Sequence, residues 1–122
     1  MVNTAVLMGR LTTTPELRYT SSNVPVTSFT LAVNRSYVKS GSERQTDFID
    51  IVAWSSTAEF VSRYFSKGQL VAVEGSIQTR TYQDKDGNNR KAFEVVANKV
   101  HFAGARKDNN IEIETEESDL PF

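Results

Sequence analysis

The sequence contains no cysteine and only one histidine among its 122 residues. Without cysteine the chain has no disulfide framework and no thiolate metal site. The histidine, His101, has no carboxylate or thiol at a recognisable catalytic spacing, so we predict a structural role for it, and neither a metal nor a cofactor. No signal-peptide pattern precedes the first predicted strand, and no apolar run approaches membrane-spanning length. These absences predict a cytoplasmic protein with no membrane partner.

Basic residues are missing from the end of the chain. Residues 108–122 hold six Asp and Glu and no Lys or Arg, which gives a net charge of −6. Residues 1–107 hold all 14 Lys and Arg and nine acids, a net charge of +5. A basic body with an acidic tail suits a polyanionic partner. We expect one folded domain at 1–104 and a disordered acidic tail at 105–122.

The segment 47–55 predicts a β-strand, because Phe, Ile, Val and Trp dominate it and neither Gly nor Pro interrupts it. Side chains alternate across a strand, so its two faces can be read separately. One face is wholly apolar and belongs in a core: Ile49, Ile51 and Ala53. The other has an aromatic residue at each end and a carboxylate between them: Phe48, Asp50, Val52 and Trp54. An unpaired buried carboxylate is costly, so we expect this second face to be exposed, although the strand taken alone slightly favours burial on both faces.

Further elements follow from the same kind of pattern. Four more strands are predicted, at 2–12, 24–35, 70–82 and 93–102, and the segment 17–19 continues the first of them. One helix is predicted from a capping box at Ser56 and Glu59 to a stop at Gly68, with Lys67 in its last turn. Its apolar stripe consists of Ala58, Val61 and Phe65. Gly75 indicates a bulge or a tight bend, and 84–89 a hairpin turn.

The order of three strands, one helix and two strands predicts an all-β, five-stranded OB-fold barrel with the helix between strands 3 and 4. The binding surface of that fold uses strands 2 and 3 and the loops between strands 1 and 2 and strands 4 and 5. In the first strand, Val6 and Met8 are apolar on the face opposite Ala5, Leu7 and Leu11. A single barrel can bury only one of these faces, so we expect a homotetramer.

Aromatic and basic residues alternate along the expected binding surface. The aromatic candidates are Tyr37, Phe48, Trp54 and Tyr82, and the interleaved bases are Arg35, Lys39, Arg44, Arg80, Lys85, Arg90 and Lys91. Unpaired bases stack on aromatic rings while Lys and Arg follow the phosphates, so this pattern indicates a single-stranded nucleic acid. The competing interpretation is core aromatics beside a solvated charged loop.

The last four residues, Asp119, Leu120, Pro121 and Phe122, place apolar side chains at the end of an acidic tail. A terminal Phe presents a ring and a carboxylate together, which suits a pocket edged by a cation. The alternative is a tail end without a role.

Together these segments resemble the bacterial and phage single-stranded DNA-binding protein family, in particular its Gram-positive members. The matching motifs are VLMGRL at 6–11, PELRY at 15–19, FTLAVNR at 29–35, QTDF at 45–48, KG at 67–68, EG at 74–75, TRTY at 79–82 and DLPF at 119–122. The resemblance implies an OB-fold, usually a homotetramer, that binds and protects single-stranded DNA in replication, recombination and repair, in the nucleoid.

The resemblance also implies residue roles. Base stacking falls to Tyr37, Phe48, Trp54 and Tyr82. Phosphate binding is expected of the bases named above and of Arg10 and Arg18, which lie in matching motifs. Residues 119–122 resemble the peptide with which the family docks partner enzymes.

Three other classes of function compete with this interpretation, and they fit the sequence to different degrees. An enzyme would need a catalytic constellation, and no serine lies in a nucleophile motif while Asp84 and Asp86 lie in an ordinary turn. A protein–protein adaptor could use the basic face for acidic partners. An RNA-binding OB protein is nearer, because nothing in the sequence excludes binding to a 2′-hydroxyl strand.

Overall fold

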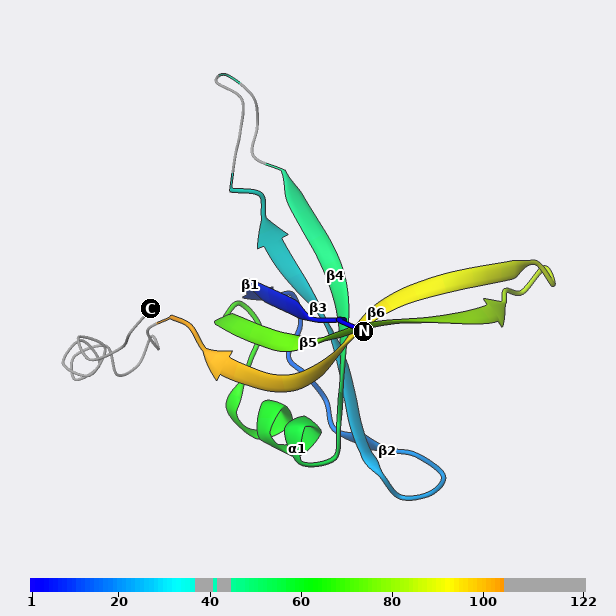
Figure 1. Cartoon of the computed structure of the whole chain (residues 1–122). Helices are drawn as coiled ribbons and strands as arrows, with labels where there is room; N and C mark the ends of the chain where they lie inside the picture. Colours follow the sequence, from blue (N-terminus) through cyan, green and yellow to red (C-terminus); the bar gives the residue numbers. More distant parts are fainter. Residues whose placement is uncertain (37–40, 42–44, 105–122) are drawn as a thin grey trace.

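The computed structural model describes residues 1–36, 41 and 45–104 (Figure 1). Its elements in chain order are β1 (Ala5–Leu11), β2 (Arg18–Tyr19), β3 (Pro25–Asn34), β4 (Thr46–Trp54), α1 (Ser55–Tyr64), β5 (Leu70–Gln83) and β6 (Asn89–Phe102). The predicted residues Tyr37, Lys39 and Arg44 and the tail 105–122 lie outside the described residues.

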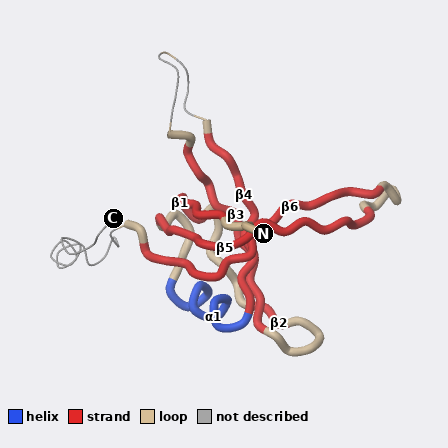
Figure 2. Tube along the Cα trace, viewed as in Figure 1, coloured by secondary structure: helices blue, strands red, loops and turns tan. Residues whose placement is uncertain are grey.

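Five strands close into a ring. The sheet runs β1-β5-β6-β4-β3-β2, and β1 also pairs with β3 at Arg10–Ala32 and Leu11–Leu31. β4 and β6 pair in parallel at Ile51–Val95 and Val52–Val96. With α1 between β4 and β5, this is the predicted OB-fold barrel, and Figure 2 shows the helix below β1 and β5. The segment 17–19 differs from the prediction, because β2 pairs with β3 and does not extend the first strand.

The core follows the predicted alternation. The inward face of β4 contributes Ile51 and Ala53, both fully buried, and Ile49 packs against them. The helix contributes Ala58 and Val61 of the predicted stripe, and Phe65, its C-cap residue, is buried beside them. Val52 is an exception on the outer face, because its partner Val96 on β6 lies beside it and leaves it 8% exposed.

Gly75 sits at an irregularity in the β5–β6 register, as predicted. A Cβ at this position would collide with the carbonyl oxygen of Val96, so only glycine permits the close approach of the two backbones.

The helix begins differently from the prediction. It starts at Ser55, directly after β4, and its N-cap residue Trp54 makes no side-chain capping hydrogen bond. The predicted capping box at Ser56 and Glu59 is therefore wrong. Ser55 has φ +55, which turns the chain from strand to helix without a loop. The helix ends at Tyr64 with Arg63 in its last turn, and Gly68 (φ +88) belongs to the turn that follows.

Two hairpins extend from the barrel (Figure 1). The β3–β4 hairpin leads to the region of 37–44, and β5 and β6 form a long arm that ends in the turn at 84–88. β6 starts at Asn89, four residues before the predicted start, so residues 89–92, of which the first three are polar, belong to the arm.

Candidate nucleic-acid interface

The outer face of β3 and β4 presents two aromatic rings on a floor of small side chains. The antiparallel register places Ala32 opposite Phe48 and Val26 opposite Trp54. Phe48 is 67% exposed and Trp54 is 44% exposed, so the predicted outward orientation of both rings is confirmed. Six residue steps along the extended strand separate them, a span of about 20 Å.

Each ring lies in a cross-strand row that ends in an arginine. Arg10 of β1 pairs with Ala32, which pairs with Phe48. Arg18 of β2 pairs with Val26, which pairs with Trp54. Directly paired residues project from the same face of a sheet, so each row combines a cation and a ring on the outer surface. Arg10 also donates a hydrogen bond to the carbonyl oxygen of Gly68 at 3.1 Å.

Between the two rows the surface is polar and acidic. Thr30 lies opposite Asp50, and its Oγ1 donates a hydrogen bond to Asp50 Oδ1 at 3.0 Å. A hollow of about 280 Å³ opens here. Its lining includes Thr13, Ser28, Thr30, Asp50, Val52 and Glu94. Sequence reasoning noted the carboxylate of Asp50 but gave it no role.

The arm continues the same face of the sheet. Val96 lies beside Val52, and alternation then brings Glu94 on β6 and Arg80 and Tyr82 on β5 to that side. The Arg80 guanidinium carbon lies 5.5 Å from the centre of the Tyr82 ring. The structure therefore places Tyr82 on the face that carries Phe48 and Trp54.

Arginines of the arm are held by carboxylates. Arg80 pairs with Glu94 at 3.4 Å, and Arg90 pairs with Asp84 at 2.9 Å. The hydrogen bond from Arg90, helped by the backbone N–H groups of Asn88 and Asp86, lowers the pKa of Asp84 below its ordinary value. Lys85 lies exposed at the tip. Lys91 is exposed on the opposite face of the arm from Tyr82, since it pairs with Thr81.

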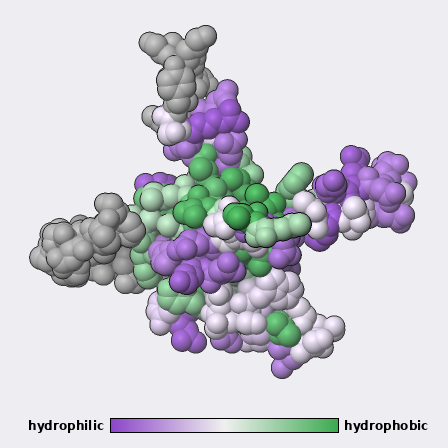
Figure 3. Space-filling model, viewed as in Figure 1, coloured by the Kyte–Doolittle hydropathy of each residue, from purple (hydrophilic) through white to green (hydrophobic). Residues whose placement is uncertain are grey.

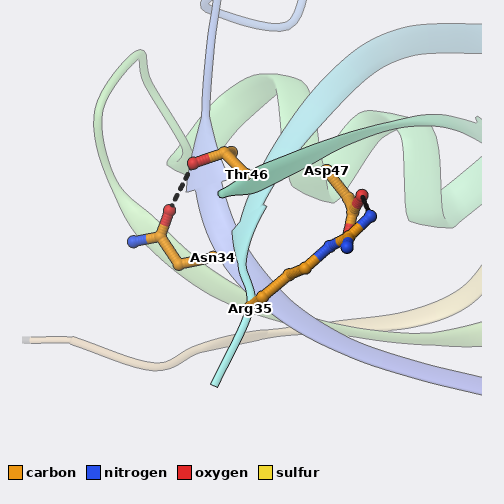
Figure 4. Close-up of polar contacts among 4 residues, drawn as sticks. All are labelled: Asn34, Arg35, Thr46 and Asp47. Carbon is orange, nitrogen blue, oxygen red and sulfur yellow. Dashed lines mark hydrogen bonds and ion pairs between the residues drawn. The ribbon is translucent and has the colours of Figure 1, made fainter. Parts of the chain in front are cut away.

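Arg35 anchors the base of the β3–β4 hairpin. Its Nε and Nη2 reach the two carboxylate oxygens of Asp47 at 3.1 and 3.0 Å, and Thr46 Oγ1 donates to Asn34 Oδ1 at 2.7 Å (Figure 4). The bidentate contact lowers the pKa of Asp47 and raises the pKa of Arg35. Arg35 therefore already has an anionic partner before any phosphate arrives.

Phe93 is an exposed aromatic of the arm that the sequence analysis did not name. Phe93 is 66% exposed on the arm, where it pairs with Thr79 on the face that Lys91 shares. Its position near the predicted hairpin turn could have indicated the exposure, because a ring so close to the turn cannot pack into the barrel core.

A second surface is apolar. Val6 and Met8 project outward from β1, and both are exposed as predicted. Figure 3 shows apolar side chains gathered over the middle of the molecule, where Figure 1 draws β1, while the tip of the arm is hydrophilic.

His101 belongs to the outer side of β6. Its Nε2 lies 2.7 Å from Glu74 Oε2 on β5. Within the described ranges 1–36, 41 and 45–104, three or more potential metal ligands do not cluster anywhere. In that same part of the chain, no helix has the length and apolar character needed to cross a bilayer.

A closed five-stranded ring with one helix between β4 and β5 defines an OB-fold, and the aromatic and arginine residues described above lie on its outer face. Comparison with known proteins identifies the branch of this class: the chain belongs to the single-strand binding protein family, whose model matches residues 2–103.

Several curated relatives are similar over most of the chain. A single-stranded DNA-binding protein of Caldanaerobacter subterraneus is 57% identical over 102 residues, which cover 84% of this chain and 68% of that protein. Single-stranded DNA-binding protein 2 of Listeria monocytogenes is 47% identical over 112 residues, covering 92% and 69%. A single-stranded DNA-binding protein of Staphylococcus aureus is 46% identical over 110 residues, covering 90% and 70%. The predicted resemblance to Gram-positive members is thereby confirmed.

Proposed function

We propose that the chain binds single-stranded DNA without regard to sequence and protects it. The observation that carries this proposal is the pair of exposed rings, Phe48 and Trp54, each in line with an arginine across a small-residue floor. Rings of this kind accept the faces of unpaired bases, which a duplex does not offer. The names of the curated relatives point to the same ligand.

The phosphates are bound by two kinds of cation. Arg10 and Arg18 end the two aromatic rows and lie ready for the backbone of a bound strand. Arg35, Arg80 and Arg90 exchange a carboxylate for a phosphate, which weakens their net contribution. Tyr37, Lys39, Arg44, Lys85 and Lys91 keep the roles that the sequence predicts for them.

Trp54 supplies the test, because it is the chain's single tryptophan. Stacking of a base on its ring quenches its fluorescence. We expect strong quenching by oligo-dT, little by duplex DNA of equal concentration, and competition by oligo-U that is weaker than by oligo-dT. Equal quenching by duplex and single strand would contradict the proposal.

We further propose that the protein assembles as a homotetramer. Val6 and Met8 form an exposed apolar surface on β1 that a second copy can cover. Closed symmetry favours a dimer of dimers.

The acidic tail has a separate proposed role. Residues 119–122 are the docking peptide for proteins of replication, recombination and repair, so the protein acts by binding and recruitment and not by catalysis. In this role it works in the cytoplasm, at the nucleoid.

A further inference from the structure

The β5–β6 arm has a second face, opposite the one that carries its tyrosine. The register pairs Thr79 with Phe93 and Thr81 with Lys91, so these four side chains project from one side of the arm. Val95 lies on the same side and is 5% exposed, because it still faces the barrel core. Phe93 is only two residues nearer the tip and is 66% exposed. The core-facing side of the sheet therefore continues beyond the barrel and carries an uncovered ring (Figure 1).

The surroundings of Phe93 match those of Phe48. The two rings are exposed to 66% and 67%. Each has a small residue as its direct cross-strand partner, Thr79 for Phe93 and Ala32 for Phe48. A small partner cannot cover an aromatic ring, so the face of the Phe93 ring is open to a stacking base.

The second face is also the better side of the arm for a phosphate. Within 77–83 and 89–95 it carries Lys91 and neither Asp nor Glu. Lys91 makes no ion pair within the part of the chain that the structure describes. On the other side of the arm, Arg80 and Arg90 already hold carboxylates. A phosphate that reaches Lys91 thus displaces no carboxylate, whereas one that reaches either arginine does.

The size of the apolar surface favours a nucleotide over a protein as the occupant. Ile77, 46% exposed, is the other large apolar side chain exposed on this face of the arm. An aromatic side chain buries about 150–250 Å², whereas a stable protein interface buries about 800 Å² on each partner. One ring and its neighbour fall well short of that area, but one ring beside one cation is enough for a nucleotide.

A strand bound to the first face can reach the second. Within 78–83, β5 pairs with β6 alone, so the arm is a two-stranded ribbon whose edges no other strand covers. Tyr82 and Phe93 are three register steps apart along this ribbon, about 10 Å, on opposite faces.

We propose that Phe93 and Lys91 form a further contact for single-stranded DNA, in which a base stacks on the Phe93 ring and Lys91 binds a neighbouring phosphate. A bound strand then crosses the edge of the arm and engages both of its faces. This proposal rests on the proposed function and adds a site to it.

The test separates the ring of Phe93 from its apolar surface. Phe93→Tyr keeps a ring, and Phe93→Leu keeps apolar bulk without one. Fluorescence anisotropy measures the affinity for labelled oligo-dT several times longer than the roughly 16 nucleotides that one OB-fold covers at most. We expect Phe93→Leu to weaken binding about fivefold or more, and Phe93→Tyr to retain the affinity, because bases stack on either ring. Circular dichroism checks that both variants fold.

Ile77→Thr is the matched control, because it removes exposed apolar surface from the same face without removing a ring. Its affinity should equal that of the unmodified chain. A loss as large as that of Phe93→Leu would overturn the proposal, since an apolar contact with a second copy would then explain both effects.

Lys91→Gln tests the phosphate contact. It should reduce the slope of log affinity against log salt by about 0.7 per protomer, and Arg63→Gln on α1 should not. An affinity that is unchanged in Phe93→Leu, or that falls equally in Phe93→Tyr, would overturn the proposal and leave binding by the other rings intact. Failure of the unmodified chain to bind oligo-dT would instead overturn the proposed function.

Discussion

Ala32 lies directly opposite Phe48 in the β3–β4 pair. Its methyl group is too small to cover the ring, and Phe48 consequently exposes 67% of its surface in an element where an aromatic would usually pack against its cross-strand partner. The pairing of a small residue with a large one therefore leaves the Phe48 ring as a flat, uncovered surface on the outer face of the sheet.

Removing either ring should weaken binding to single strands. Phe48→Ala and Trp54→Ala should each cost about 1–3 kcal/mol per occupied site, since a base loses its stacking partner. Fluorescence anisotropy with labelled oligo-dT measures the change. Tyr64→Ala is the control, because Tyr64 is exposed to 45%, like Trp54, but lies on α1. Equal effects of all three substitutions would show that Phe48 and Trp54 have no special role in binding the strand.

Neutralising an arginine at the end of a row should change the salt dependence of binding. Each phosphate contact to a single strand contributes about 0.7 to the slope of log affinity against log salt. Arg10→Gln and Arg18→Gln should each reduce the slope by about that amount per protomer. Arg63→Gln on α1 should leave the slope unchanged. Slopes that stay the same for Arg10 and Arg18 would show that the phosphates pass elsewhere.

Charge placed on the apolar surface of β1 should prevent assembly. Light scattering of the unmodified protein should give about four times the chain mass. Met8→Lys should lower this value, since a lysine in an apolar interface would be desolvated without a partner. Ser66→Lys, in an exposed turn after α1, should keep the full mass. A monomer in the unmodified protein would contradict the tetramer.

Deleting residues 119–122 should separate recruitment from DNA binding. The truncated chain should bind oligo-dT as well as the full chain or slightly better, because part of an acidic competitor is gone. That gain should fade as salt rises, since exposed charges are screened within about 10 Å at moderate ionic strength. In a pull-down from a bacterial extract, the full chain should capture partner enzymes and the truncated chain should not. Retention of the same proteins by both forms would place docking on the barrel.

Acid should loosen the tip of the arm. Arg90 and two backbone N–H groups lower the folded-state pKa of Asp84, so its contribution to stability is full above the unfolded value of about 3.9. The contribution is lost as the pH falls through the lowered folded-state pKa. An NMR titration of the carboxyl groups, read together with the amide of Gly87, measures this.

Asp84→Asn should abolish that pH dependence at the tip. Asp86→Asn should retain it, because the Asp86 side chain makes no hydrogen bond within the described residues. An Asp84 that titrates at its ordinary value would refute the ion pair with Arg90.

The sequence predicts the strands best where alternation and burial coincide. Ile51 and Ala53 face the core and Phe48 and Trp54 face outward, because the strand is apolar on one side only. Val52 breaks the pattern, since its burial depends on β6, which lies more than 40 residues away in the chain. The residues near Val52 in the sequence therefore do not indicate that β6 will cover it.

Other details depend on contacts that no short segment encodes. Ser56 and Glu59 have the spacing of a capping box, but the chain enters the helix at Ser55 from the end of β4 and leaves no capping position for Ser56. The polar residues 89–91 become strand because they pair with β5 across the arm. The ion pairs of Arg35 with Asp47 and of Arg80 with Glu94 likewise follow from strand pairing, whereas Arg90 reaches Asp84 across the hairpin turn.

Closure of the ring determines how far the chain can fold while it is being synthesised. β1 leaves the ribosome first, yet its main partner β5 begins only at Leu70, and the parallel pair of β4 needs Val95 and Val96. β3 and β4 are neighbours in the chain and can pair early, whereas the closing pairs must overcome the entropy of long loops. Until β6 is complete, the nascent chain is an open sheet with unpaired edges. Such edges are where unfinished chains pair with one another, so the last strand removes an aggregation hazard as well as completing the barrel.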